Sequence, residues 1–243
     1  MTSVQLKDMI EQDLIPRGWV ERGFAAFSGL PNPIGWMMYR KLKRRMANRA
    51  SARFDSVVAN LGPDDVVIDL GANVGDITDV LAKHGASVYA FEPEPSTYAA
   101  LSEKMAGRPN VTVINSAVSD FDGHTSLVLP ASFRDNPRSA SKAASIVHER
   151  YKSDQACEVE VKVTDFARFL AELGSKVTLI KVDIEGAEWP VLKALRDADL
   201  MDKFDMMFVE THERFDVSTV PSVKQHQAWA AGLTRPYINL FWK

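Results

Sequence analysis

Two aspartates flank a glycine-bearing turn near residue 70, and their positions indicate a binding site for a positively charged ligand. The segment reads Val66-Val67-Ile68-Asp69-Leu70-Gly71-Ala72-Asn73-Val74-Gly75-Asp76. An apolar strand that passes through such a turn into a helix is how doubly wound α/β domains bring backbone close to a nucleotide-type ligand. The turn reads G-x-N-x-G instead of G-x-G-x-x-G, and Asp76 stands where a dinucleotide would place its pyrophosphate. Because negative charge at a helix N-terminus opposes phosphate, a cationic ligand without phosphate fits better.

S-adenosylmethionine, which carries a sulfonium and an ammonium group, is a ligand of this kind. Asp69 can attract the ammonium group directly or through water, and amides at the helix start can hold the methionine carboxylate. Gly71 and Gly75 permit positive φ and a close backbone approach, and Asn73 tolerates the same left-handed region. Glu92 ends the next apolar run, about twenty residues after Gly71, where an acid can accept hydrogen bonds from ribose hydroxyls.

A second motif supplies candidates for catalysis. It reads Ile180-Lys181-Val182-Asp183-Ile184-Glu185-Gly186-Ala187-Glu188. Asp183 ends a buried strand and could hold the cofactor's amino group, orient a substrate hydroxyl or ligate a hard cation, although no metal site is assigned. Glu185 could act beside it, or simply be a carboxylate favoured at a helix start. His212 follows another buried strand and is the best general-base candidate by residue type, with an ordinary hydrogen-bonding histidine as the alternative.

The elements that carry these residues alternate between strand and helix from residue 64 onward. We expect strands at 66–70, 87–91, 111–115, 125–129, 158–163, 177–182, 206–209 and 237–242, and helices at 77–83, 95–106, 165–173, 189–198 and 221–231. This order predicts an α/β fold, a Rossmann-like, doubly wound, mostly parallel sheet with helices on both faces. Residues 125–129 and 158–163 are expected to pair antiparallel as a small β insertion on that sheet. The segment 131–157 between them reads as a variable loop or lid. Near residue 243, only one of the two strands of a terminal hairpin can be identified.

Residues 1–58 are assigned to a separate N-terminal helical region, and 59–243 to the Rossmann-like domain. No acidic residue occurs between Arg22 and Phe54, whereas basic residues accumulate at Arg40, Lys41, Lys43, Arg44, Arg45, Arg49 and Arg53. Two interpretations stay open. The helices could pack their aromatic side chains on the core and direct the basic ones outward. They could instead form a basic amphipathic surface for an anionic substrate, or for peripheral membrane contact through residues 40–53.

Composition limits the classes of function. With 243 residues and a net charge of −3, the chain suits one globular domain with an appendage, and its charge does not indicate a nucleic-acid partner. The single Cys157 excludes an internal disulfide framework and a cysteine-rich zinc site. The N-terminus does not read as a secretory signal, and no apolar run reaches membrane-spanning length. A cytoplasmic enzyme is therefore expected.

Five motifs, in this order, resemble the FkbM family of S-adenosylmethionine-dependent methyltransferases: V-I-D-L-G-A-N-V-G-D, Y-A-F-E-P, N-S-A-V-S-D, L-I-K-V-D-I-E-G-A-E and F-V-E-T-H. The resemblance covers about residues 64–243. It implies a class I methyltransferase fold and O-methylation of a hydroxyl on a sugar, polyketide or similar small-molecule acceptor. Carried over by motif, the implied cofactor contacts are Asp69, Gly71, Asn73 and Gly75 at the methionine end, Glu92 at the ribose, and Ser116, Ala117 and Val118 at the adenine. Asp183 and Glu185 would face the transfer site.

Other functions remain as alternatives. A nicotinamide-dependent oxidoreductase on the same sheet would require a turn that tolerates pyrophosphate, which Asp76 opposes. Methylation of an exocyclic amine of a nucleic acid is disfavoured because D-I-E-G stands where an N/D-P-P-Y-type loop would follow the fourth strand of the sheet. A non-catalytic cofactor-binding or scaffold module, using its basic N-terminal helices to bind a partner, is the third alternative.

Overall fold

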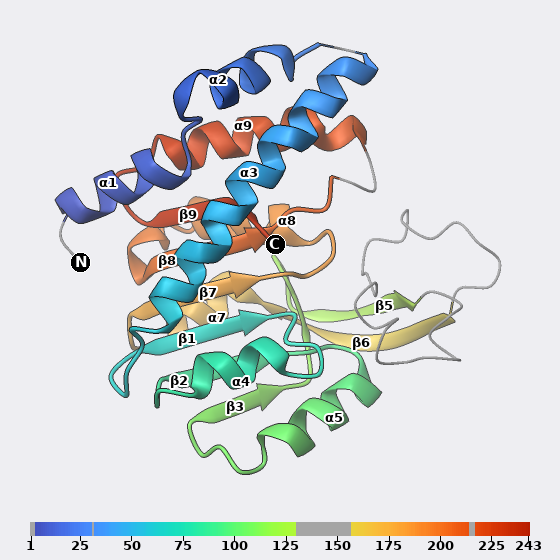
Figure 1. The fold of residues 1–243 in the computed structure, drawn as a ribbon. Helices are drawn as coiled ribbons and strands as arrows, with labels where there is room; N and C mark the ends of the chain where they lie inside the picture. The colour runs from blue at the N-terminus through green and yellow to red at the C-terminus, as the bar shows by residue number, and fades with distance from the viewer. Residues whose placement is uncertain (1–2, 31, 130–156, 214–216) are drawn as a thin grey trace. The chain divides into compact units, whose positions relative to one another are not determined.

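The computed structural model describes residues 3–30, 32–129, 157–213 and 217–243, which form two compact units (Figure 1). The central unit comprises Val58–Met206. The terminal unit joins Met1–Val57 to Met207–Lys243. This grouping of the N-terminal helices with the C-terminal segment is not indicated by the sequence pattern.

The central unit contains alternating strands and helices. Its strands are β1 (Val66–Leu70), β2 (Ser87–Phe91), β3 (Val111–Ile114), β4 (Ala117–Ser119), β5 (Gly123–Leu129), β6 (Cys157–Asp165) and β7 (Val177–Val182). Its helices are α4 (Asp76–Ala82), α5 (Pro95–Met105), α7 (Phe166–Glu172), α8 (Glu188–Asp197) and the short η4 (Met201–Lys203). β8 (Phe204–Glu210) begins in this unit and ends in the terminal unit.

The larger sheet confirms the predicted α/β class. Its strand order is β3-β2-β1-β7-β8-β9. β1 runs parallel to both β2 and β7, and β2 runs parallel to β3. The order reverses beside β1, so the carboxyl ends of β1 and β7 lie at a topological switch point, where doubly wound folds bind ligands.

Helices cover both faces of this sheet, as predicted. Phe91 of β2 meets Phe169 of α7, with ring centroids 5.0 Å apart. The preceding Ala90 packs with Leu101 and Met105 of α5. Because neighbouring residues of a strand point to opposite faces, α5 and α7 must lie on opposite sides of β2. The buried strands therefore have apolar neighbours on both sides, which explains their nearly continuous apolar sequences.

The small β insertion forms, but as a sheet of its own. β5 pairs antiparallel with β6 in the register Thr125 opposite Val161, which confirms the predicted pairing. β4 adds in parallel to β6 and makes a separate three-stranded sheet, β4-β6-β5, instead of an extension of the larger one. β4 is not among the predicted strands, because three residues are too few to show a period. Of the predicted loop 131–157, Cys157 begins β6 and the remainder lies outside the described residues.

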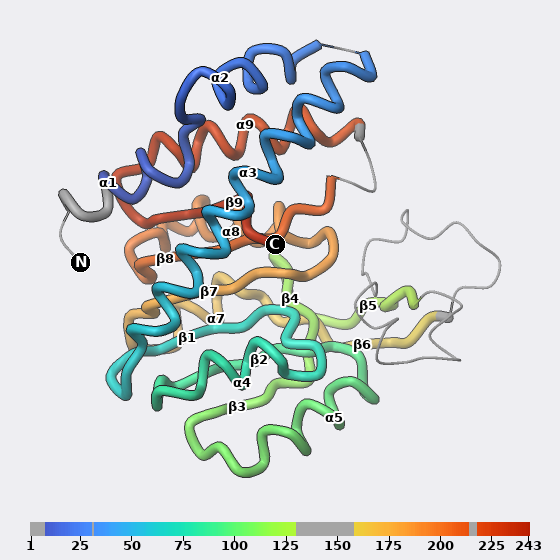
Figure 2. The backbone as a smooth tube through the Cα atoms, viewed as in Figure 1, coloured from blue at the N-terminus to red at the C-terminus, as the bar shows by residue number. Residues whose placement is uncertain are grey.

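The terminal unit is built on long helices. It contains α1 (Ser3–Asp13), α2 (Gly18–Phe27), α3 (Pro33–Val58, which ends at the boundary), η5 (Val217–Thr219), α9 (Val220–Ala231) and β9 (Tyr237–Trp242). Figure 2 shows β9, near the chain's end, beside α1, near its start. Phe54 of α3 contacts Phe208 and Trp242, with centroid separations of 5.3 and 4.9 Å. Arg53 pairs with the buried Asp13 at 2.6 Å.

The first interpretation of the N-terminal residues agrees with the structure in part. Tyr39 and Phe54 are buried, as core packing requires, while Trp19 is 87% and Phe27 57% exposed. A basic surface for an anionic substrate or a membrane stays a prediction. No helix among the described residues is long and apolar enough to cross a lipid bilayer.

Candidate active site

The turn after β1 has the backbone conformation that its sequence predicts. Gly71, Asn73 and Gly75 have φ values of 79°, 51° and 84°. The glycines permit a close approach to other parts of the chain. A Cβ on Gly71 would lie 1.9 Å from the carbonyl oxygen of Asp183, and a Cβ on Gly75 would lie 2.6 Å from Leu101 Cδ1. The glycines therefore let the turn pack tightly on the end of β7 and on α5.

A buried ion pair between Asp69 and Lys181 stabilises this turn. Asp69 is fully buried, with Lys181 Nζ 3.0 Å from its Oδ1 and the Thr78 hydroxyl donating to its Oδ2 at 2.7 Å. Lys181 also donates to the carbonyl oxygen of Gly71 at 2.6 Å. Burial alone would lower the pKa of Lys181, but the charges of Asp69 and Asp183 outweigh it and the pKa is raised. Lys181 therefore stays charged and fixes the turn.

This arrangement changes how Asp69 could act. The predicted contact of Asp69 with a ligand's ammonium group stays a prediction. In this structure the buried carboxylate is already paired with Lys181, whose positive charge opposes the approach of a second ammonium group. Lys181 is not among the predicted site residues. The available signal was a lysine inside the apolar run Leu179-Ile180-Lys181-Val182, because a buried lysine almost always has a specific anionic partner.

Glu92 links the end of β2 to the same turn. Its side chain is 6% exposed, and its two oxygens accept the backbone N–H groups of Asn73 and Glu94, both at 2.9 Å. Burial raises the pKa of Glu92 to about 7, although the two N–H groups favour its charged form. Near pH 7 the protonated and ionised forms of this carboxyl are therefore about equally populated.

Asp76 lies in the first turn of α4, as predicted. It is exposed and pairs with Lys104 of α5 at 2.6 Å. Because the side chains of Asp76 and Lys104 are 72% and 39% exposed, solvent screens this pair and it contributes little to folding. The pair leaves the charges of Asp76 and Lys104 balanced at the helix N-terminus, with the Asp76 carboxylate the more exposed of the two.

Ser116, Ala117 and Val118, the predicted adenine neighbours, are buried where the chain passes from β3 to β4. The Ser116 hydroxyl lies 2.8 Å from both the Ala117 carbonyl oxygen and Thr164 Oγ1. These contacts join the end of the large sheet to the small one. The role of the three residues beside adenine stays a prediction.

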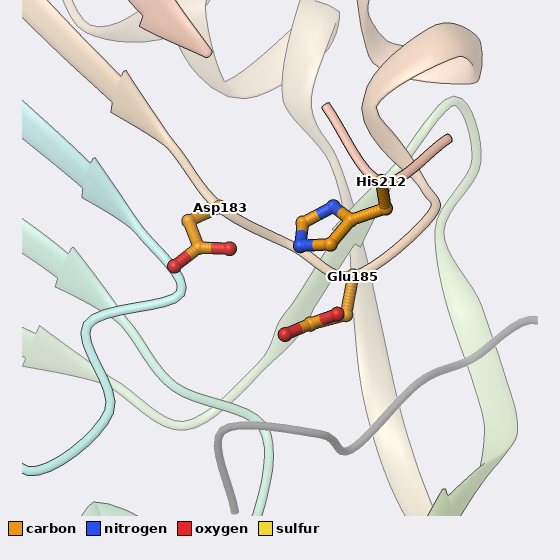
Figure 3. Close-up of side chains that lie close together, drawn as sticks. All are labelled: Asp183, Glu185 and His212. Carbon is orange, nitrogen blue, oxygen red and sulfur yellow. The ribbon is translucent and has the colours of Figure 1, made fainter. Parts of the chain in front are cut away.

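The three predicted catalytic side chains come from two turns (Figure 3). Asp183 and Glu185 lie just after β7, where the Asp183 N–H still donates to Leu70 at 3.0 Å and Glu185 has a φ of 56°. His212 follows β8. Asp183 and Glu185 belong to the central unit, and His212 belongs to the terminal unit. A carboxylate can accept a proton or ligate a hard cation, and an imidazole can act as a base or as a ligand near neutral pH.

Within the terminal unit, α3 fixes the segment that carries His212. Lys43 donates to the Thr211 carbonyl oxygen at 3.0 Å, and the Tyr39 hydroxyl donates to Glu213 at 2.7 Å. Lys43 also forms an ion pair with the buried Glu213. Burial opposes the charge of Glu213, but Lys43 and Tyr39 outweigh it and the pKa of Glu213 is lowered. This anchor is not among the predicted features, because no local pattern connects residues so far apart in the chain.

Comparison with known proteins agrees with the fold and the motifs. The family model described as "Methyltransferase FkbM domain" matches residues 69–230, which is more than half of the chain. "Methyltransferase 1" of Beauveria bassiana is 26% identical over 74% of this chain and 78% of its own length. "Hexuronic acid methyltransferase AglP" of Haloferax volcanii is 25% identical over 71% of this chain and 66% of its own.

A third relative is similar over a stretch of comparable length. "31-O-demethyl-FK506 methyltransferase FkbM" of Streptomyces tacrolimicus is 30% identical over 63% of this chain and 67% of its own length. The matched residues 69–230 include the glycine-bearing turn, Glu92 and all three side chains of Figure 3. The chain belongs to the FkbM methyltransferase family.

Proposed function

We propose that this protein transfers a methyl group from S-adenosylmethionine to a hydroxyl oxygen of a small metabolite, a sugar or a polyketide-type acceptor. Membership of a methyltransferase family supports methyl transfer. The names of two relatives, which refer to a hexuronic acid and to the 31-O position of FK506, support a metabolite acceptor. The observation that carries the choice of cofactor is the acid-rich turn after β1, because it disfavours phosphate.

The donor groups around this turn suit the proposed cofactor. Its two nearby lysines are each paired with an aspartate, Lys181 with Asp69 and Lys104 with Asp76, so neither supplies unpaired positive charge for a pyrophosphate. Glu92 offers carboxylate oxygens at the position where acids bind ribose hydroxyls. When bound, S-adenosylmethionine supplies an electrophilic methyl group on a positively charged sulfur.

The proposed task of the three catalytic candidates is to activate the acceptor. An alcohol is a weak nucleophile while it keeps its proton, and a positioned base commonly contributes about 10²- to 10⁴-fold in rate. We assign the base to His212, with Asp183 and Glu185 orienting its ring and stabilising the imidazolium. Their carboxylates would also attract a cationic methyl donor. Holding acceptor and donor in line provides the remaining acceleration.

Calorimetric titration and a methyl-transfer assay together test this function. We expect S-adenosylmethionine and S-adenosylhomocysteine to bind and NADH not to bind. Transfer of a radiolabelled methyl group is then measured on sugars, sugar acids, hydroxylated polyketides and ribosomal RNA. NADH binding would contradict the cofactor assignment, and labelled RNA would contradict the metabolite acceptor. Binding of S-adenosylmethionine without transfer to any acceptor would favour a non-catalytic module.

A further inference from the structure

The terminal unit contains a hollow that the proposed chemistry does not use. It has a volume of about 880 Å³ and is lined by one face of α3 and by the ends of β8 and β9. Among its lining residues are Trp36, Arg40, Arg44, Asn48, Glu213 and Trp242. Its volume lies within the usual range for small-molecule sites, about 300–1,000 Å³. We call it the α3 hollow.

The α3 face that lines this hollow follows from helical spacing. Trp36, Arg40, Arg44 and Asn48 are each four residues apart, so their side chains form one row along the helix. Trp36 is partly buried, while Arg40, Arg44 and Asn48 are exposed. The row therefore presents an indole ring at one end and two guanidinium groups at its centre.

The charge of the hollow is unbalanced. Apart from the pair of Lys43 and Glu213, the hollow has four cationic side chains and one anionic side chain. The cationic ones are Arg40, Lys41, Arg44 and Lys243, and the anionic one is Glu210. Arg40 and Arg44 have no hydrogen bond or ion pair with any residue that the structure describes. Like charges four residues apart on a helix repel, so an anion between the two guanidinium groups would relieve an unfavourable interaction.

Two further charged groups of the hollow neutralise each other. Lys43 and Glu213 form a buried ion pair, with the Tyr39 hydroxyl as an additional donor. Trp36 stacks on Tyr39 with ring centroids 5.7 Å apart and an interplanar angle of 21°. The floor is thus a fixed, neutral and partly aromatic surface beneath two available guanidinium groups. Such a surface suits a flat or ring-shaped ligand that carries an anion.

We propose that the α3 hollow binds the anionic part of the methyl acceptor, a carboxylate or phosphate group on a sugar-sized ring. This inference rests on the proposed function and narrows its substrate class. The link to the reaction runs through the chain, because Glu213 lines the hollow and is the residue after His212. Guanidinium groups bind carboxylate and phosphate with paired hydrogen bonds, so Arg40 and Arg44 would select the charged acceptor.

A lipid surface is the competing source of anions, and the geometry favours a small molecule. The most exposed aromatic side chain of the described residues, Trp19, belongs to α2 and does not line the hollow. A bilayer would be met by protruding apolar side chains, whereas a hollow with aromatic walls surrounds a single ring.

The test uses two probes that differ in one group. p-Nitrophenyl glucuronide carries a carboxylate, and p-nitrophenyl glucoside is its neutral counterpart. Binding to the full-length protein is measured by calorimetry and by quenching of tryptophan fluorescence. The variants are Arg40→Gln and Arg44→Gln, with Arg45→Gln as the matched control, because Arg45 is an exposed α3 residue that lies over Phe24 and does not line the hollow.

We expect the glucuronide to bind at least tenfold more tightly than the glucoside. Arg40→Gln and Arg44→Gln should each weaken glucuronide binding about fivefold, leave glucoside binding unchanged, and preserve S-adenosylmethionine affinity. Arg45→Gln should change neither. A reduced effect of both variants at high salt would agree with a charge-based site.

Three outcomes would overturn the inference: equal binding of the two probes, binding of neither, or an equal loss with Arg45→Gln. If the protein sediments with phosphatidylglycerol vesicles and does not bind the glucuronide, the α3 hollow would be a lipid-binding surface instead of an acceptor site. Failure of the proposed function is seen separately, since it would appear as loss of S-adenosylmethionine binding or of methyl transfer while the glucuronide still binds.

Discussion

Glu92 should make cofactor binding depend on pH in a way that its neighbours do not. Burial raises its pKa from 4.5 to about 7, a shift that corresponds to about 3 kcal/mol of penalty on the charged form. The direction of the effect on folding stability follows from this shift. The folded protein holds a proton that the unfolded chain has lost, so the contribution of Glu92 to stability is fully present below pH 4.5 and is lost as pH rises through about 7.

Ribose hydroxyls would reverse part of that penalty. A hydroxyl that donates to a carboxylate favours the ionised form, so binding should lower the pKa of Glu92 and release a proton. If the pKa in the complex falls to its ordinary value or below, affinity for S-adenosylmethionine should rise about tenfold between pH 6 and pH 8. At pH 7, about half a proton should be released for each cofactor bound.

Calorimetry in buffers of different ionisation enthalpy measures both quantities. Glu92→Gln keeps an acceptor oxygen but cannot titrate, so it should bind more weakly and lose this part of the pH dependence. Any titration of the cofactor itself persists in the variant and is removed by the comparison. Glu103→Gln, at an exposed position on α5, is the matched control and should keep the full slope. An unchanged slope in Glu92→Gln would refute the reasoning.

Three further predictions concern the ion pair, the base and the turn. Asp69→Asn leaves Lys181 charged and buried, so denaturant unfolding should show a loss of about 3–5 kcal/mol, with partial recovery when Lys181→Met is added; an unaffected Asp69→Asn would contradict the pairing. His212→Gln should lower methyl transfer about 10²- to 10⁴-fold while calorimetric affinity for S-adenosylmethionine stays within twofold, and normal turnover would remove His212 as the base. Gly71→Ala and Gly174→Ala share a positive φ, 79° and 73°, but only at Gly71 would the new Cβ meet a carbonyl oxygen. Gly174→Ala should cost about 1–2 kcal/mol in unfolding free energy and Gly71→Ala distinctly more, and equal costs would exclude the clash.

Much of the fold follows from local sequence patterns. β1, β2, β7 and β9 begin and end at the predicted residues, because each is an apolar run bounded by polar or turn-forming residues. The antiparallel pairing of β5 with β6 was also predictable, since Val159, Val161 and Val163 alternate with charged residues. β4 was not, because its three residues owe their strand conformation to pairing with β6.

The candidate site was predictable in its residue types and less so in its energetics. Strand ends indicated Asp69, Glu92 and Asp183, because ligands of parallel sheets bind at the carboxyl ends of strands. The pairing of Asp69 with Lys181 depends on β1 and β7 lying side by side, although the two residues are 112 positions apart in the sequence. Only the sheet order turns an isolated acid and an isolated lysine into one buried pair.

Helix α3, which lies outside the residues that match the family model, has one observed role and one proposed role. One side of α3 anchors the residues on either side of His212, through Lys43 to Thr211 and through Tyr39 to Glu213. The next positions along the same helix, Arg40 and Arg44, line the hollow proposed for the acceptor's anion. Acceptor choice and base placement would then depend on one rigid element. A change of acceptor could arise on the exposed row of α3 without disturbing its buried anchor.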